Sequence, residues 1–169
     1  MVRLAREGNR KAQKEIYERL GGKMLSVCLR YVQDRETALD MLQDGFVALF
    51  AKLGDYKGDG SFEGWARRVF ATTCLMYLRK KDALKMSEDL ETAGDIGADT
   101  PSQRSDLSYK EILSLVMQMP SGYRTVFNLY VMEGYSHEEI GQMLGISQVT
   151  SRSQLNRARK WLQEKLKER

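Results

Sequence analysis

The sequence is poor in the residues from which metal sites, disulfide networks and rigid turns are built. Its 169 residues include one histidine, two cysteines and two prolines. Cys28 and Cys74 lie far apart within apolar helical stretches, which favours buried thiols over a disulfide. One histidine and two distant cysteines offer no plausible ligand set for zinc, and no Ser/His/Asp or Cys/His set is apparent. We therefore expect no metal, no cofactor and no enzymatic activity.

Long apolar segments and strand-like patterns are also missing. No apolar run approaches the length of a membrane span, and residues 1–7 lack the apolar core of a secretory signal. Hydrophobic residues make up 42% of the chain and charged residues 30%, as in ordinary soluble proteins. Because apolar residues recur at helical rather than strand spacing, we predict an all-α fold. We expect the protein to lie in the cytoplasm.

Charge divides the chain into three blocks. Residues 1–81 carry 16 Lys and Arg against 10 Asp and Glu, and residues 107–169 carry 9 against 6. Between them, residues 82–106 carry 2 against 7 and hold few large apolar side chains, which predicts a flexible acidic linker. Two basic blocks suit two nucleic-acid-binding domains joined by a segment that avoids DNA. We therefore predict two small helical domains, residues 1–81 and 107–169.

Apolar spacing predicts four helices before the linker and four after it. Asp34 and Ser61 are the expected caps of the third and fourth. The first four helices are expected at residues 10–20, 23–33, 35–53 and 62–80. The later four are expected at residues 107–118, 121–132, 138–144 and 148–167.

Residues 134–160 are typical of two helices joined by a tight turn. Ser136 and Glu139 have the spacing of a capping box, Gly145 can end the first helix, and Ser147 can cap the second. An ordinary helical hairpin in a core would give the same turn. The second helix, however, begins with short polar side chains and continues into arginines, an order that suits a helix entering the DNA major groove. The candidate contacts are Ser147, Gln148, Thr150, Ser151, Arg152, Gln154, Arg157, Arg159 and Lys160.

A second candidate surface mixes aromatic and basic residues at the end of the first domain. Aromatic faces can stack on unpaired bases while cations follow the phosphates, a combination used for single-stranded nucleic acid. Phe62 and Trp65 also fall on the apolar stripe of their helix, so a core role is the alternative. The candidates are Tyr56, Lys57, Phe62, Trp65, Arg67, Arg68, Arg79 and Lys80.

A third surface lies on the predicted helix of residues 35–53. Asp40, Gln43 and Asp44 fall on neighbouring turns and form a polar, partly acidic face. From the residues alone, a solvated surface is the favoured interpretation. Docking of a basic protein partner is the alternative.

Taken in order, these segments resemble a bacterial RNA polymerase sigma factor of the extracytoplasmic-function type. The resemblance covers essentially the whole chain. It rests on residues 34–46, 60–68 and 77–81 in the first half, and on residues 119–127, 133–140, 145–147 and 155–159 in the second. Such factors consist of a promoter-melting domain, region 2, and an upstream-element-binding domain, region 4. The resemblance therefore implies a transcription initiation factor that is not an enzyme.

The resemblance also assigns roles to the three surfaces. Asp40, Gln43, Asp44 and Phe46 match the segment that docks on the clamp helices of the largest polymerase subunit. Residues 55–62 match the loop that holds a flipped base of the minus-ten element. The following helix matches the one that contacts the non-template strand, which adds Ser61, Thr72 and Thr73 to the candidates. The helix starting near Ser147 is expected to read the minus-thirty-five element.

The implied partners are core RNA polymerase, promoter DNA and an anti-sigma protein, which in this family is often membrane-anchored. Three positions depart from common family patterns and bear on base preference. Thr72 and Thr73 stand where many members have Asn, Met76 replaces a frequent Asp, and Val149 replaces a common Gly.

Two other classes of function fit the residues less completely. The first is a stand-alone helix-turn-helix regulator that binds duplex operator without polymerase. The second is a helical adaptor whose basic faces contact acidic proteins. An adaptor would show no binding to DNA and no steep loss of binding with added salt.

Overall fold

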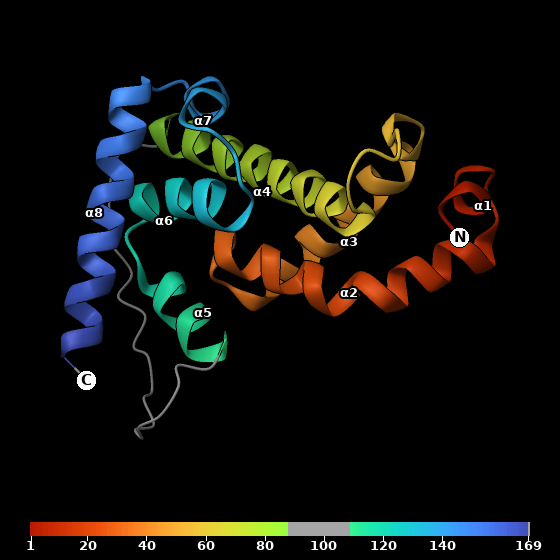
Figure 1. Ribbon diagram of the computed structural model, residues 1–169, viewed down its shortest axis with the longest axis horizontal. Helices are drawn as coiled ribbons and strands as arrows, with labels where there is room; N and C mark the ends of the chain where they lie inside the picture. The colour runs from red at the N-terminus through yellow and green to blue at the C-terminus, as the bar shows by residue number, and fades with distance from the viewer. Residues whose placement is uncertain (88–108, 169) are drawn as a thin grey trace.

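The computed structural model describes residues 1–87 and 109–168, and most of the predicted acidic linker therefore lies outside the described residues. Every regular element within these two ranges is helical, as predicted (Figure 1). No helix in this part of the chain is both long enough and apolar enough to cross a membrane.

The N-terminal half contains four α-helices: α1 (Val2–Arg6), α2 (Arg10–Val32), α3 (Arg35–Ala51) and α4 (Phe62–Ser87), with the short 3-10 helix η1 (Leu53–Asp55) after α3. Asn9 and Asp34 cap the N-termini of α2 and α3. Each side chain accepts a hydrogen bond from the backbone N–H three residues later, of Ala12 and Thr37 respectively. Helices α2, α3 and α4 pack against one another in all three pairs. Their contact forms the core of this half.

Two helices are longer than predicted. Helix α2 runs without a break through Gly21 and Gly22, where two helices were expected. Each glycine weakens a helix by about 1 kcal/mol, but Ile16, Leu20 and Met24 continue one buried stripe across the pair, and their burial outweighs that cost. Helix α4 extends to Ser87, so the first residues of the predicted linker are helical.

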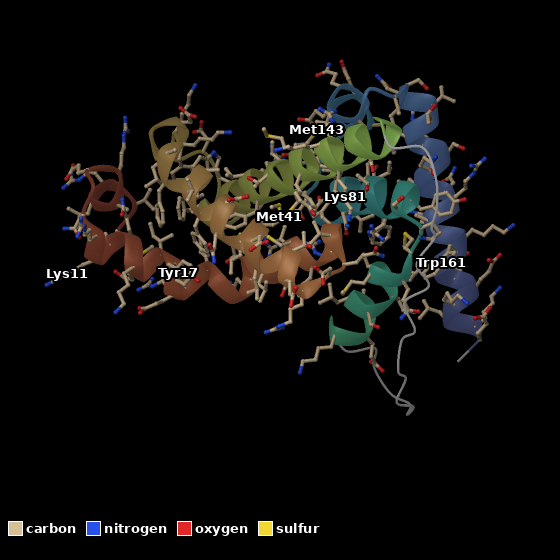
Figure 2. The ribbon with its side chains drawn as sticks, turned by 180° about the vertical axis from the view of Figure 1, so that it is seen from behind. Lys11, Tyr17, Met41, Lys81, Met143 and Trp161 are labelled. Atoms are coloured by element: carbon tan, nitrogen blue, oxygen red, sulfur yellow. The ribbon has the colours of Figure 1, made fainter. Side chains whose placement is uncertain are left out.

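The packing of α3 against α4 depends on one glycine. A Cβ atom at Gly45 would lie 2.2 Å from the ring of Phe70, so no larger residue fits without moving α4. Beside it, the ring of Phe46 contacts Phe70 edge-on at 5.1 Å and Tyr17 of α2 at 4.6 Å between ring centroids. Tyr17 is labelled in Figure 2. Met41 is buried in the same core.

The C-terminal half contains α5 (Tyr109–Gln118), α6 (Ser121–Phe127), α7 (His137–Leu144) and α8 (Gln148–Lys167). Helix α8 has the predicted bounds. The helix predicted for residues 121–132 changes pitch halfway, because α6 passes into a π-helical turn, η2 (Asn128–Met132). Helix α8 packs on α5, α6 and α7 and runs along one end of the molecule (Figure 1).

The two halves are in direct contact, through α2 on one side and α5 and α6 on the other. At the centre of this contact, Arg30 of α2 donates a hydrogen bond to the Glu133 carboxylate over 2.8 Å, with side chains 3% and 1% exposed. The Asn128 amide donates to the backbone carbonyl of Arg30 over 2.8 Å, and Arg124 donates to that of Tyr31 over 3.4 Å. A buried polar network therefore joins the halves.

Candidate nucleic-acid interface

The α7–turn–α8 unit has the caps that the sequence predicts. Ser136 and Glu139 form a complete capping box, and Gly145 has the left-handed φ of 68° that ends α7. Ser147 then accepts a hydrogen bond from the backbone N–H of Thr150 over 3.0 Å. A Cβ atom at Gly141 would lie 2.7 Å from the carbonyl oxygen of Ile146, so this glycine lets the turn pack closely on α7. The start of α8 is thereby fixed relative to α7.

Helix α8 has one buried side and one exposed basic side. Ser151, Leu155 and Ala158 are buried, at a spacing of three to four residues. The exposed side carries Gln148, Val149, Arg152, Ser153, Asn156, Arg157, Arg159 and Lys160. No Asp or Glu occurs in residues 140–163, while four Lys and Arg do. The exposed side therefore combines positive charge with polar and apolar groups, and no acidic residue lies among them.

Two of the predicted contacts on α8 are turned inward. Ser151 is fully buried, and its hydroxyl lies 2.8 Å from Nδ1 of His137, so it faces the core in this structure and not the side proposed to meet DNA. Ser151 lies four residues before the buried Leu155, on the same side of the helix, and this spacing already indicated the core. Gln154 is partly buried, with its side chain against Gly122 of α6. Sequence reasoning missed Ser153 and Asn156, which the helix turns outward instead.

The His137 ring, at the start of α7, contacts Tyr130 of η2 and Ser151 of α8. Its ring stacks on Tyr130 at 4.4 Å between centroids, and its Nδ1 faces the Ser151 hydroxyl. Partial desolvation, followed by the positive charges of Arg152 and Arg159, lowers the pKa of His137 below its usual value. The neutral ring is therefore favoured, as suits a structural contact.

The loop between α3 and α4 brings three aromatic rings together. The rings of Tyr56, Phe62 and Trp65 lie 5.3 to 5.7 Å apart, and each side chain is half-buried. The Tyr56 hydroxyl donates to the carbonyl of Gly60 over 2.9 Å, which closes the loop on itself. Half-burial is compatible with both interpretations offered for these residues, because each ring packs on its neighbours and remains partly exposed.

Four polar residues of α4 make contacts within the molecule. Arg67 donates to Glu63 over 2.9 Å, and the Arg68 guanidinium lies 4.8 Å from the centre of the Tyr135 ring, in the C-terminal half. The hydroxyls of Thr72 and Thr73 donate to backbone carbonyls one turn earlier in α4. Lys57, Ser61 and Lys80 are exposed.

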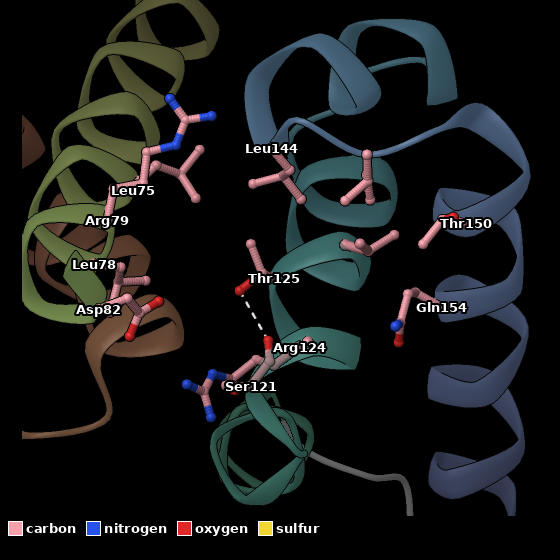
Figure 3. A pocket seen from close by; sticks show the side chains of 13 residues that line it. Leu75, Leu78, Arg79, Asp82, Ser121, Arg124, Thr125, Leu144, Thr150 and Gln154 are labelled. Carbon is pink, nitrogen blue, oxygen red and sulfur yellow. Dashed lines mark hydrogen bonds between the residues drawn. The ribbon is translucent and has the colours of Figure 1, made fainter. Parts of the chain in front are cut away.

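A cleft of about 320 Å³ lies where the two halves meet. Helix α6 stands between α4 and α8, and side chains from all three line the cleft (Figure 3). Leu75, Leu78 and Arg79 come from α4, while Thr150 and Gln154 come from α8. Candidate DNA-binding residues of both halves therefore border one cleft.

Burial shifts the pKa values of the ionisable groups in the network that joins the two halves. Desolvation raises the pKa of Glu133, and the nearby Arg30 opposes this by favouring the carboxylate. Desolvation also lowers the pKa of Arg124 to about 10. The second oxygen of Glu133 and two nitrogens of Arg30 have no protein partner among the described residues. Such a network is stable only while both partners stay together.

The candidate polymerase surface on α3 is only partly as predicted. Asp40, Gln43 and Asp44 are exposed on one face. Phe46, in contrast, is 4% exposed and part of the core, so it does not lie on this exposed face. It follows Leu42 by four residues and precedes Leu49 by three, a spacing that already indicated the core. The same face exposes Leu39 and Val47, which sequence reasoning missed; they are 39% and 71% exposed.

Two family models match the chain, one in each half. The model described as Sigma-70 region 2 matches residues 16–84, and the model described as Sigma-70, region 4 matches residues 109–162. The chain is 26% identical to the RNA polymerase sigma-H factor of Pseudomonas aeruginosa, over 98% of this chain and 92% of that protein. It is 25% identical to the ECF RNA polymerase sigma-E factor of Haemophilus influenzae, over 98% and 93%.

Two solved structures share the fold. The sigma factor RpoE in complex with the anti-sigma factor NepR, from Bartonella quintana, superposes with a TM-score of 0.62 at 20% identity, over 93% of this chain and 98% of that one. CnrH in complex with the cytosolic domain of CnrY superposes with a TM-score of 0.53 at 21% identity, over 98% and 94%.

Proposed function

The chain belongs to the sigma-70 family of bacterial RNA polymerase sigma factors, in its extracytoplasmic-function type with regions 2 and 4, and from this we propose how it acts. It binds core RNA polymerase, directs it to specific promoters and helps to melt the downstream element. The observation that carries this proposal is that regions 2 and 4 match in order along one chain. Such a factor regulates transcription and is not an enzyme.

We propose that α8 reads the upstream promoter element. A helix that starts with exposed short side chains and continues into cations can place its first turns against base edges and its later turns against phosphates. The exposed members of the predicted set support this role: Ser147, Gln148, Thr150, Arg152, Arg157, Arg159 and Lys160. Ser153 and Asn156 join them because they lie on the same exposed side.

The downstream element is assigned to the aromatic loop and α4. Tyr56, Phe62 and Trp65 are each partly exposed, and aromatic rings of this kind can stack on bases of a melted strand. Cations and hydroxyls along α4 can follow its phosphates. The residues proposed for this strand are Lys57, Ser61, Arg67, Arg68, Thr72, Thr73, Arg79 and Lys80.

Polymerase docking is assigned to the exposed face of α3. Asp40, Gln43 and Asp44 supply polar and negative groups, and Leu39 and Val47 add apolar area beside them. A mixed face of this kind suits a partner surface with basic and apolar residues. This face lies outside the contact between the two halves, so polymerase can reach it while the halves remain together.

Binding to both promoter elements requires the two halves to separate. The minus-ten and minus-thirty-five elements are about 25 base pairs apart, or roughly 85 Å along the duplex at 3.4 Å per base pair. In this structure, which we call the closed form, the two halves are in contact. Helices α4 and α8 border one cleft, and the Arg68 guanidinium contacts the Tyr135 ring. We therefore propose that the closed form is the free state. The anti-sigma partner that we propose, acting in the cytoplasm, would keep the promoter-binding surfaces covered.

Run-off transcription with purified core RNA polymerase tests this function. The chain is added to core enzyme on a library of promoter fragments, and the start sites and fragments used are sequenced. We expect transcripts from a defined subset with a shared upstream and downstream element. A protein that binds duplex operator tightly without polymerase, and yields no transcript with it, would instead be a stand-alone regulator.

A further inference from the structure

The exposed side of α8 is centred on an apolar residue. At 100° per residue, Val149, Ser153 and Asn156 lie within about 60° of one another. They are opposite the side buried by Ser151, Leu155 and Ala158. Val149 is 73% exposed, the largest exposed fraction among the exposed large hydrophobic residues in the described part of the chain.

Neither packing nor helix propensity accounts for a valine at this position. The side chain is too exposed to add to the core. A β-branched residue also lowers helix stability relative to alanine, because its χ1 freedom is lost against the preceding turn. A single exposed apolar residue is ordinary on a protein surface. Here, however, it lies one turn from Arg152 in a segment of four cations and no acidic residue, which is charge-complementary to DNA.

Resting on the proposed function of α8, we propose that Val149 is a specificity-determining residue that packs against the C5-methyl group of a thymine in the upstream element. The major-groove edge of a base pair offers donors, acceptors and, for thymine alone among the four bases, a methyl group. A valine side chain can neither donate nor accept a hydrogen bond, so the methyl group is the feature that it can select. Arg152 and Asn156, one and two turns further along α8, can hydrogen-bond to the neighbouring bases.

Replacing thymine by deoxyuridine tests this contact, because it removes the methyl group and nothing else. Upstream elements are first selected from duplex promoter fragments by the chain bound to core polymerase. Each thymine of the selected element is then replaced in turn, and the dissociation constant of the holoenzyme is measured. We expect one position at which the wild type loses binding about 3- to 4-fold, as for one buried methyl-sized group.

Substitutions of Val149 assign that loss to its side chain. Val149→Ala should bind the thymine element more weakly and be indifferent to deoxyuridine at the same position. Val149→Thr keeps the branch and one methyl group and should retain part of the sensitivity. Val131→Ala, at an exposed valine outside the turn motif, should behave as the wild type. Because each substituted residue is exposed, the variants should fold.

The proposal is overturned if Val149→Ala shows the same deoxyuridine penalty as the wild type, or if the selected elements contain no thymine. Either result would leave the transcription function intact, because promoter-dependent transcripts would still be made. If neither protein directed polymerase to any fragment, the proposed function itself would be wrong, and the thymine contact would be rejected with it.

Discussion

The two halves of the molecule present their DNA-binding candidates in different states. In the C-terminal half, Arg152, Arg157, Arg159 and Lys160 of α8 face outward and form no ion pair within the described residues. Only nearer the end of the helix does Lys165 pair with Glu168, over 2.7 Å. In the N-terminal half, Arg67 is paired with Glu63, and the Arg68 guanidinium contacts the Tyr135 ring of the other half. The first surface is ready for a ligand, whereas the second must exchange internal contacts for external ones. The contact between the halves therefore controls the N-terminal surface more than the C-terminal one.

The largest effect is expected from breaking the buried ion pair that joins the halves. Glu133→Ala leaves the Arg30 guanidinium buried without its carboxylate, which should destabilise the closed form by about 3–5 kcal/mol. Urea unfolding should show the loss, and small-angle scattering should show a larger radius of gyration. Glu138→Ala, at an exposed carboxylate five residues away, should change stability by less than about 1 kcal/mol.

A double substitution separates loss of the pair from loss of charge alone. Arg30→Met combined with Glu133→Leu replaces the pair by apolar groups and should recover most of the stability. If Glu133→Ala kept wild-type stability and dimensions, the contact between the halves would not be what holds the molecule closed.

A smaller effect is expected on the exposed side of α8. Arg152→Ala should weaken binding to the upstream element by about 1–3 kcal/mol, because one base contact is lost. Unlike the Glu133 variant, it should leave the radius of gyration unchanged. Lys11→Ala, at an exposed lysine that extends from α2, provides the control (Figure 2). An unchanged footprint with Arg152→Ala would count against the assignment of the recognition helix.

The α3 face provides a test that should be independent of both. Asp40→Arg should reduce binding to core polymerase severalfold, since it reverses the charge at the centre of that face. It should affect neither the unfolding free energy nor the dimensions of the free protein. A pull-down with core enzyme measures the loss, and wild-type recovery in it would remove the docking assignment.

The smallest effect concerns pH and the one histidine of the chain. Because the pKa of His137 is lowered in the fold, its contribution to stability is present above the unfolded value of about 6.5. That contribution is lost as the pH falls from there through the lowered, folded pKa. An NMR titration should place the midpoint below 6.5, and Arg152→Ala should move it upward. A midpoint at or above 6.5 would contradict the desolvated position of the ring.

Patterns of neighbouring residues predicted the turn motif correctly, but they could not predict contacts between residues far apart in the sequence. The capping box at Ser136, the left-handed Gly145 and the bounds of α8 all follow from residues within one turn of each other, and all are confirmed. Arg30 and Glu133, in contrast, are 103 positions apart, and no sequence pattern links them. The predicted break in α2 failed for the same reason, because tertiary burial outweighed the local preference of two glycines.

For two candidate site residues, helical position and residue type point in different directions. A family motif and polarity place Phe46 and Ser151 on binding surfaces, but each has the spacing of a core residue and is buried. Val149 was noted as a departure from the family and not as a contact, because its exposure depends on how α8 packs. The orientation of α8 is set by α6 and α7, which local patterns do not fix.

The close approach of α3 to α4 at Gly45 limits how this factor could be altered by exchange of parts. A Cβ atom there would collide with Phe70, so a helix imported from a relative would need both positions matched. Arg30 and Glu133 must likewise be exchanged together, because each is the buried partner of the other across the contact between the halves. Chimaeras intended to redirect promoter choice should therefore carry over such partners as sets, or the hybrid would inherit a mismatch at each junction.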